Sequence, residues 1–246
     1  ILPLLHLHFM DLNYLAVLII ITAGMLTSVL KEKLTVMAAL AGGLLAVIIF
    51  IGAGFTGIGL LAAFFILGVS ATGWKFNIKT KDGLAEKRQG KRNAGQVFAN
   101  AGVAAILALL AIYNTDDAAL LLLMLAASFS AATADTLSSE LGNIFGSRYY
   151  HILSFKKMQR GANGAVSLHG TLAGIIGSAI IALIYVLGTS WNAQHVLIIL
   201  VAGTVGNIAD SLLGLTLENK GLLNNNAVNF LNTAVGAGVA GVLYKL

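Results

Sequence analysis

The sequence has no cysteine and little charge. The absence of cysteine among its 246 residues excludes disulfides, cysteine-ligated zinc and thiol catalysis. Charged residues make up only 10% of the chain and hydrophobic residues 58%, and the mean hydropathy is +0.88. A soluble protein of this composition would expose large apolar patches, so that class is excluded too. We therefore expect an all-α polytopic membrane protein in which residues 1–246 form a single integral membrane domain.

Several motifs that identify an enzyme class are also missing. The sequence contains no GxxxxGK[ST] phosphate loop, no HExxH, no GxSxG and no aspartate-rich DDxxD motif. The paired-aspartate signature of CDP-alcohol phosphotransferases is absent, and the histidines show no metal-ligand spacing. No basic segment with a small-residue cleavage site precedes the first apolar run, so we expect no secretory signal peptide.

Long uncharged runs are what the sequence does have. About 20 apolar residues are needed to cross the hydrocarbon core as a helix. Two of the runs are long enough for two helices each, and turn-forming residues at "IGAGFTGIG" and "LGTSWNAQH" mark where each run breaks. The sequence therefore predicts about eight spans, at residues 12–30, 34–51, 55–73, 94–113, 117–135, 166–187, 195–213 and 226–244.

The basic residues are distributed unevenly over the loops between these spans. Fourteen of the 15 lysines and arginines lie in the first, third, fifth and seventh loops, and only Lys245 lies on the other side. The even loops have no basic residue, and one of them carries Asp116 and Asp117. The positive-inside rule then predicts that the odd loops are cytoplasmic, including those at about 75–92 and about 136–165, and that both termini lie on the opposite side.

Two parts of the chain resemble each other. The string "ADTL" at 134–137 recurs as "ADSL" at 209–212, and "NGAV" at 163–166 recurs as "NNAV" at 225–228. Thr171 and Gly174 then pair with Thr233 and Gly236 at the same spacing. These matches predict a parallel internal repeat of spans 5–6 and 7–8, and membrane proteins often place their sites where such repeats meet.

Two aspartates occupy equivalent places in this repeat. Asp135 and Asp210 each lie near the cytoplasmic end of an apolar span. Carboxylates at membrane depth are costly and usually face the protein interior; alternatively each lies at the water boundary or pairs with a basic residue. Glu140 is five residues beyond Asp135, about 140° round a helix. Either the helix ends between these two residues or they serve different partners.

Asparagines and basic residues supply candidates for binding phosphate. Asparagine beside glycine suits an anion, although the same residues also make turns and tie helices together. Asn163 and Asn225 are the better candidates because both are expected where a helix starts. The third loop is basic enough to be attracted to anionic lipid headgroups, but Arg88 and Arg92 also lead directly into the span that contains Gln96.

Four blocks of the sequence resemble the successive signature blocks of a known family. They are "RNAGQVFANAG", "ATADTLSSELG", "GANGAVSLHGTLAG" and "NIADSLLGLTLE…NNNAVNFLNT". Their order is similar to that of the phytyl-phosphate kinase family, which includes plant chloroplast enzymes and animal transmembrane protein 19. The similarity runs from about Thr72 to Thr233, with His169 standing where a leucine is usual.

The resemblance implies transfer of a phosphoryl group from a nucleoside triphosphate, with CTP favoured, to an isoprenyl monophosphate. Asp135, Glu140 and Asp210 would be the catalytic residues and would hold Mg²⁺. The lipid tail would lie in the bilayer between the repeats, among membrane lipids, and we expect no nucleic-acid partner. The residues expected to bind phosphate are Lys75, Arg88, Arg92, Asn93, Gln96, Asn100, Arg160, Asn163, Asn207, Asn225, Asn226 and Asn229.

A transporter or flippase of a lipid phosphate or small anion is the alternative. Repeats and polar residues near helix breaks also suit that class. A transporter should carry polar residues through to the far face, whereas here the even loops and the far halves of the spans are nearly featureless. This distribution favours an enzyme with a site on one side.

Overall fold

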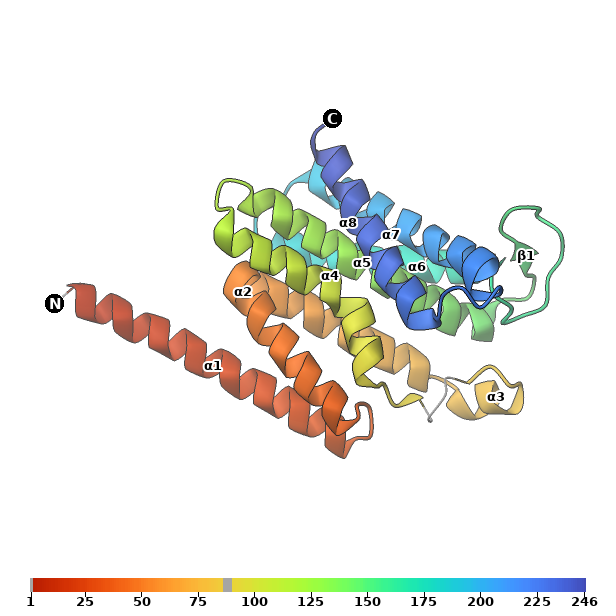
Figure 1. The fold of residues 1–246 in the computed structure, drawn as a ribbon, viewed down its shortest axis with the longest axis horizontal. Coiled ribbons are helices and arrows are strands. Elements are labelled where there is room, and N and C mark those ends of the chain that lie inside the picture. The colour runs from red at the N-terminus through yellow and green to blue at the C-terminus, as the bar shows by residue number, and fades with distance from the viewer. Residues whose placement is uncertain (1, 86–89) are drawn as a thin grey trace.

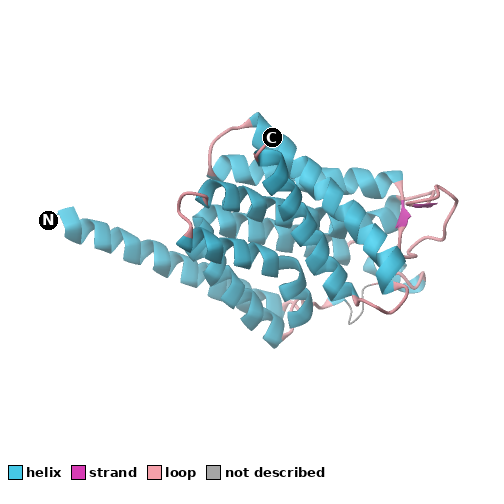
Figure 2. Cartoon of the chain, turned by 45° about the horizontal axis from the view of Figure 1, so that its top comes forward, coloured by secondary structure: helices cyan, strands magenta, loops and turns pink. Residues whose placement is uncertain are grey.

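The computed structural model describes residues 2–85 and 90–246, which form a helical bundle with one small pair of strands at one end (Figures 1 and 2). The long helices are apolar over most of their surface, as membrane spans are. The helices are α1 (Leu2–Leu30), α2 (Val36–Gly73), α3 (Phe76–Lys81), α4 (Ala94–Tyr113), α5 (Ala118–Phe145), α6 (Leu168–Gly188), α7 (Ala193–Leu213) and α8 (Asn225–Tyr244).

In the described part of the chain, seven helices are long and apolar enough to cross a membrane. One of them, α2, has 38 residues and would be about 57 Å long if straight, nearly twice the hydrocarbon core. It is interrupted at Gly54, whose φ of 58° and ψ of −153° are not helical, and Figure 1 shows its two arms doubling back. Phe65 of the second arm accordingly packs against Ala38 and Ala39 of the first. Counting the two arms of α2 separately, the described helices provide eight apolar segments, as predicted, with the break inside "IGAGFTGIG".

The conformation of Gly54 is open only to glycine, so this turn is a point of sensitivity. Gly54→Ala is expected to destabilise the protein by about 1–3 kcal/mol through backbone strain. A Cβ there would meet nothing within 4 Å, so a steric clash adds nothing to this effect. Gly238→Ala is the matched control, since that position also has open space but an ordinary helical backbone. Thermal unfolding in detergent measures both, and an unchanged midpoint for Gly54→Ala would contradict the expectation.

The second predicted break is also confirmed. Helix α6 ends at Gly188, and Asn192 caps α7 by accepting hydrogen bonds from the backbone N–H groups of Gln194 (2.9 Å) and His195 (3.2 Å). Helix α5, in contrast, continues to Phe145 instead of ending near 135. No glycine or proline interrupts it before Gly142, and the buried side chain of Leu137 keeps this last part packed.

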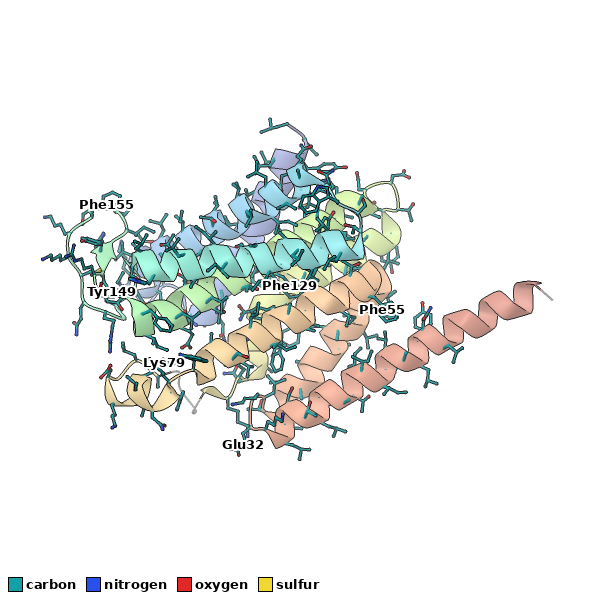
Figure 3. The ribbon with its side chains drawn as sticks, turned by 180° about the vertical axis from the view of Figure 1, so that it is seen from behind. Glu32, Phe55, Lys79, Phe129, Tyr149 and Phe155 are labelled. Carbon is teal, nitrogen blue, oxygen red and sulfur yellow. The ribbon has the colours of Figure 1, made fainter. Side chains whose placement is uncertain are left out.

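Helix α5 lies at the centre of the bundle and contacts α2, α4, α6, α7 and α8. Phe129, near its middle, is labelled in Figure 3 and is fully buried. It stacks on Phe64 of α2 with 5.9 Å between ring centroids. Glycines allow α7 and α8 to approach α5 closely, because a Cβ at Gly206 of α7 or Gly236 of α8 would strike Ala131 of α5. Close packing through small residues is how membrane helices gain contact without a hydrophobic driving force.

The chain between α5 and α6 is closed by strands β1 (Tyr150–His151) and β2 (Ala165–Val166), which pair antiparallel with Tyr150 opposite Val166. This loop and α3 lie at the same end of the bundle (Figure 1), and Figure 3 shows Lys79 of α3 and Tyr149 there. We call this the basic end, because the loops that carry most of the lysines and arginines meet there. That it faces the cytoplasm remains a prediction.

The internal repeat also remains a prediction, and one detail of it is wrong. Asn225 is the first residue of α8, as expected for a helix start. Asn163 instead lies in the loop before β2, and Ser167 caps α6 by accepting from the N–H of Gly170 at 3.1 Å. The two asparagines therefore do not occupy equivalent places, because the strand pair separates Asn163 from its helix.

Candidate active site

A cavity of about 220 Å³ opens at the basic end between α2, α4, α5, α7, α8 and the loop between α5 and α6. Its lining is mainly polar, which is unusual for a protein whose composition is so apolar. Ten of the predicted site residues line it: Arg92, Gln96, Asn100, Asp135, Glu140, Asn163, Asn207, Asp210, Asn225 and Asn229. These residues come from segments separated by as much as half the chain, so the fold brings them together.

Two carboxyl groups meet in this cavity. Asp135 of α5 and Asp210 of α7 both line it, and their side chains lie close enough to interact. Asn232 of α8, which is fully buried, donates from Nδ2 to Oδ1 of Asp210 at 2.9 Å and fixes that carboxyl. Two neighbouring carboxylates cannot both stay ionised unless positive charge lies between or beside them. The pair therefore favours a shared proton or a bound cation.

Glu140 has a different partner. It forms a buried ion pair with Lys79 of α3, and the Lys79 side chain is only 1% exposed. Lys79 Nζ also donates to the backbone carbonyls of Ala71 (3.0 Å) and Thr72 (2.7 Å), in the last turn of α2. Because α5 continues past Glu140, the second of the two alternatives holds, and Asp135 and Glu140 serve different partners.

The predicted metal trio does not form. Among the residues that the structure describes, no three histidine, aspartate or glutamate side chains are arranged to hold a metal ion. Glu140 faces Lys79 because five residues of continuous helix turn it about 140° away from Asp135. Of the three predicted metal ligands, Asp135 and Asp210 remain together in the cavity as a carboxyl pair.

Arg92 is directed into the bundle. Its backbone is held by the segment before α2, since its N–H donates to Lys33 O at 2.9 Å and its carbonyl accepts from Thr35 N–H at 3.0 Å. The guanidinium lies 5.3 Å from the centre of the Phe64 ring, a cation–π contact, and packs directly over Gly68. This anchoring places a cation at the wall of the cavity.

Other predicted phosphate ligands lie elsewhere. Arg160 forms an ion pair with Asp82 at the surface, and Lys75 lies over the Phe145 ring at 5.5 Å. Neither is among the described residues that line the cavity. The carboxylate of Asp82 reaches the guanidinium of Arg160 because the end of α3 lies against the loop between α5 and α6. Arg88 lies outside the described residues.

Several asparagines have structural partners. Asn93 and Gln96 form a capping box at the start of α4, with bonds of 3.1 Å and 2.9 Å. Asn163 Nδ2 donates to Oδ1 of Asn219 at 2.9 Å and so ties the loop to the segment between α7 and α8. Asn93 and Asn226 line an adjoining cavity of about 480 Å³, which shares Gln96, Glu140 and Asn225 with the first.

The cavity also contains residues that the sequence did not single out. Glu218 belongs to a π-helical turn, Gly214–Glu218, that follows α7; such turns are frequent at functional sites. Tyr149 donates to Gly142 O at 2.7 Å, and burial raises the pKa of its phenol, partly opposed by Arg160. Asn100 is 6% exposed, and its Oδ1 accepts no hydrogen bond from the described residues. A water or a ligand donor in the cavity would satisfy that oxygen.

Comparison with known proteins places the chain in a family. The model of a family described as integral membrane protein DUF92 matches residues 18–237. The chain belongs to this family. The match confirms the membership that the four signature blocks indicated, and it covers every described residue of the cavity.

Three relatives show how far the similarity extends. Protein VTE6, chloroplastic, of Arabidopsis thaliana is 34% identical over 193 residues, which are 76% of this chain. Uncharacterized membrane proteins of Methanocaldococcus jannaschii and Synechocystis sp. are 38% and 36% identical, over 77% and 80% of this chain and 76% and 77% of their own lengths. The match spans only 58% of the length of the chloroplast protein. No solved structure matches the chain.

Proposed function

We propose that this protein is a membrane-embedded isoprenyl phosphate kinase. It transfers the γ-phosphoryl group of a nucleoside triphosphate, CTP being favoured, to an isoprenyl monophosphate. An oxygen of the lipid phosphate bonds to the γ-phosphorus and the bond to the β–γ bridging oxygen breaks, giving isoprenyl diphosphate and nucleoside diphosphate. The proposal rests on one observation: Asp135 and Asp210 present a carboxyl pair in a polar cavity at the basic end of a membrane bundle.

This reaction does not need a general base. The second ionisation of a phosphate monoester has a pKa of about 6, so the attacking oxygen is already ionised at neutral pH. The described lining of the cavity accordingly contains no histidine. Phosphoryl transfer depends on positioning and on stabilising charge that spreads over the phosphoryl oxygens, and amides, hydroxyls and ions supply both.

The charge balance of the cavity favours a divalent cation. Four carboxyl residues line it, namely Asp135, Glu140, Asp210 and Glu218, while Arg92 is the only lysine or arginine in its described lining. The positive charge of Lys79 offsets the negative charge of Glu140. Phosphate groups could enter such a cavity only with added positive charge. Mg²⁺ suits one or two carboxylates together with phosphate oxygens, so Asp135 and Asp210 would hold it and it would neutralise the phosphoryl oxygens when bound.

The interior of the bundle favours an enzyme over a transporter. Beyond the cavity, toward the far end, α5 is packed through the fully buried side chains of Leu123, Leu125 and Phe129. Ile181 of α6 and Ile199 of α7 fill the same core. These apolar side chains lie between the polar cavity and the far end of the bundle, as expected of a site that opens on one side.

Direct assay tests the proposal. Purified protein in lipid nanodiscs is incubated with Mg²⁺, each nucleoside triphosphate in turn, and isoprenyl monophosphates of several lengths. Formation of isoprenyl diphosphate, absent without Mg²⁺, is the expected result. Failure with every pair, together with uptake of a lipid phosphate or anion in proteoliposomes, would favour the transporter.

Two arginines provide an internal comparison. Arg92→Met removes the cation at the cavity wall and is expected to raise KM for a phosphate substrate about tenfold or more, because charge-assisted bonds to phosphate contribute about 1.5–3 kcal/mol. Arg160→Met removes a surface ion pair and should change KM less than twofold. Steady-state kinetics with varied lipid and nucleotide measure both. Equal effects of the two substitutions would contradict the assignment of Arg92.

A further inference from the structure

A separate cavity, of about 340 Å³, lies between α1, both arms of α2 and the start of α4. Its walls are mainly apolar, and the small residues Gly24, Gly42 and Ala46 lie among larger side chains. It lies within the spans, where lipid chains surround the protein. We call it the apolar groove.

The apolar groove and the polar cavity share two residues. Arg92 and Gln96 line both. The guanidinium of Arg92, held over Phe64, therefore stands where a polar compartment changes into an apolar one. A molecule that occupies both compartments must be amphipathic, with its anionic group beside Arg92.

The site predicted for the lipid tail, between the helix pairs α5–α6 and α7–α8, is filled by the protein. Ala131 of α5 is fully buried, and a Cβ at Gly206 or Gly236 would strike it. Ser130 and Ser178 similarly crowd Gly203 of α7. The tail needs another place, because this packing leaves no room for a chain.

We propose that the apolar groove binds the phosphate-proximal part of the isoprenyl chain, with its phosphate at Arg92. This inference rests on the proposed kinase function and adds to it the place and extent of the lipid site. Glycine and alanine along the groove leave width for a methyl-branched chain. The helix α1 that forms one wall packs mainly on α2 and is otherwise little buried, so the chain can enter sideways from the bilayer.

The length of the groove limits how much of the chain it holds. On α1 its lining extends from Ile20 to Ser28, about 12 Å along a helix. The hydrocarbon core is about 30 Å thick, so the distal part of a long isoprenyl chain remains in lipid. The protein should therefore discriminate the first isoprene units and accept chains of different length beyond them.

Photo-crosslinking tests this placement. The full chain in nanodiscs is labelled with an isoprenyl monophosphate carrying a diazirine in its second isoprene unit, and the adducts are mapped by mass spectrometry. Adducts on α1, α2 and the start of α4 support the groove. Adducts confined to α6, α7 or α8 overturn it, as does equal displacement of the probe by phosphatidic acid. Absence of specific labelling overturns it as well.

A matched pair of glycine substitutions gives the second measurement. A Cβ at Gly24 or at Gly238 meets nothing within 4 Å, but only Gly24 lines the groove. Gly24→Leu should reduce labelling at least tenfold and raise KM for the lipid phosphate at least tenfold, with KM for the nucleotide unchanged. Gly238→Leu should change none of these, and equal effects of the two would overturn the inference.

The two proposals fail separately. Diphosphate formation with labelling outside the groove would leave the kinase intact and remove the lipid site. Labelling in the groove with no phosphoryl transfer to the lipid would retain the lipid site and remove the kinase.

Discussion

Replacing either Asp135 or Asp210 with asparagine is expected to lower kcat for isoprenyl diphosphate formation about 10³-fold or more. Metal-ion catalysis contributes several kcal/mol of charge stabilisation, and each 1.36 kcal/mol corresponds to a factor of ten in rate. The protein should remain folded, because asparagine keeps the side-chain oxygen that accepts from Asn232 and removes repulsion between two carboxylates. A thermal midpoint equal to or above that of the wild type would show this.

Asp116→Asn is the control for these variants. Asp116 lies in the loop between α4 and α5, at the end of the bundle away from the cavity, and is exposed. Its loss should leave kcat and the dependence on Mg²⁺ concentration unchanged. Full turnover by Asp135→Asn or Asp210→Asn would remove that residue from the catalytic set.

Lys79→Met is expected to destabilise the protein by about 3–5 kcal/mol, the usual effect of breaking a buried ion pair on one side. The substitution leaves Glu140 buried without its ammonium and removes the donors to Ala71 O and Thr72 O. Thermal unfolding in detergent should show a midpoint lowered by several degrees.

The control for Lys79 is its neighbour. Lys81 is exposed at the end of the same short helix, and Lys81→Met should shift the midpoint little. In the double variant Lys79→Met/Glu140→Met, apolar side chains replace the whole pair, which is often neutral, so much of the lost stability should return. Equal midpoints for Lys79→Met and Lys81→Met would show that the buried pair contributes nothing.

The sequence predicted the spans and the central acidic pair because both follow from local physics. Apolar runs need a certain length to cross a bilayer, and glycine-rich breaks such as the one at Gly54 interrupt them. Asp135 and Asp210 were recognisable because a carboxylate within an apolar run is costly unless it has a function. These properties are visible without knowing which helices pack together.

The partners of the charged residues were not predictable in this way. Lys79 is one of seven basic residues in its loop, and no local feature indicates that it, of those that the structure describes, is the buried one. The pairing of Arg160 with Asp82 depends on how two loops meet, and the burial of Asn232 beside Asp210 depends on how α8 crosses α7. Side-chain direction over such separations is set by tertiary packing, so the composition of a loop cannot supply it.

The ion pair of Lys79 and Glu140 also constrains how the protein is made. The two residues are 61 positions apart in the chain, so at about 5–20 residues per second roughly 3–12 s separate their synthesis. During that interval the carboxylate of Glu140, which offsets the cost of burying the ammonium of Lys79, has not yet been synthesised. The end of α2 and α3 therefore reach their final form only after α5 has been inserted.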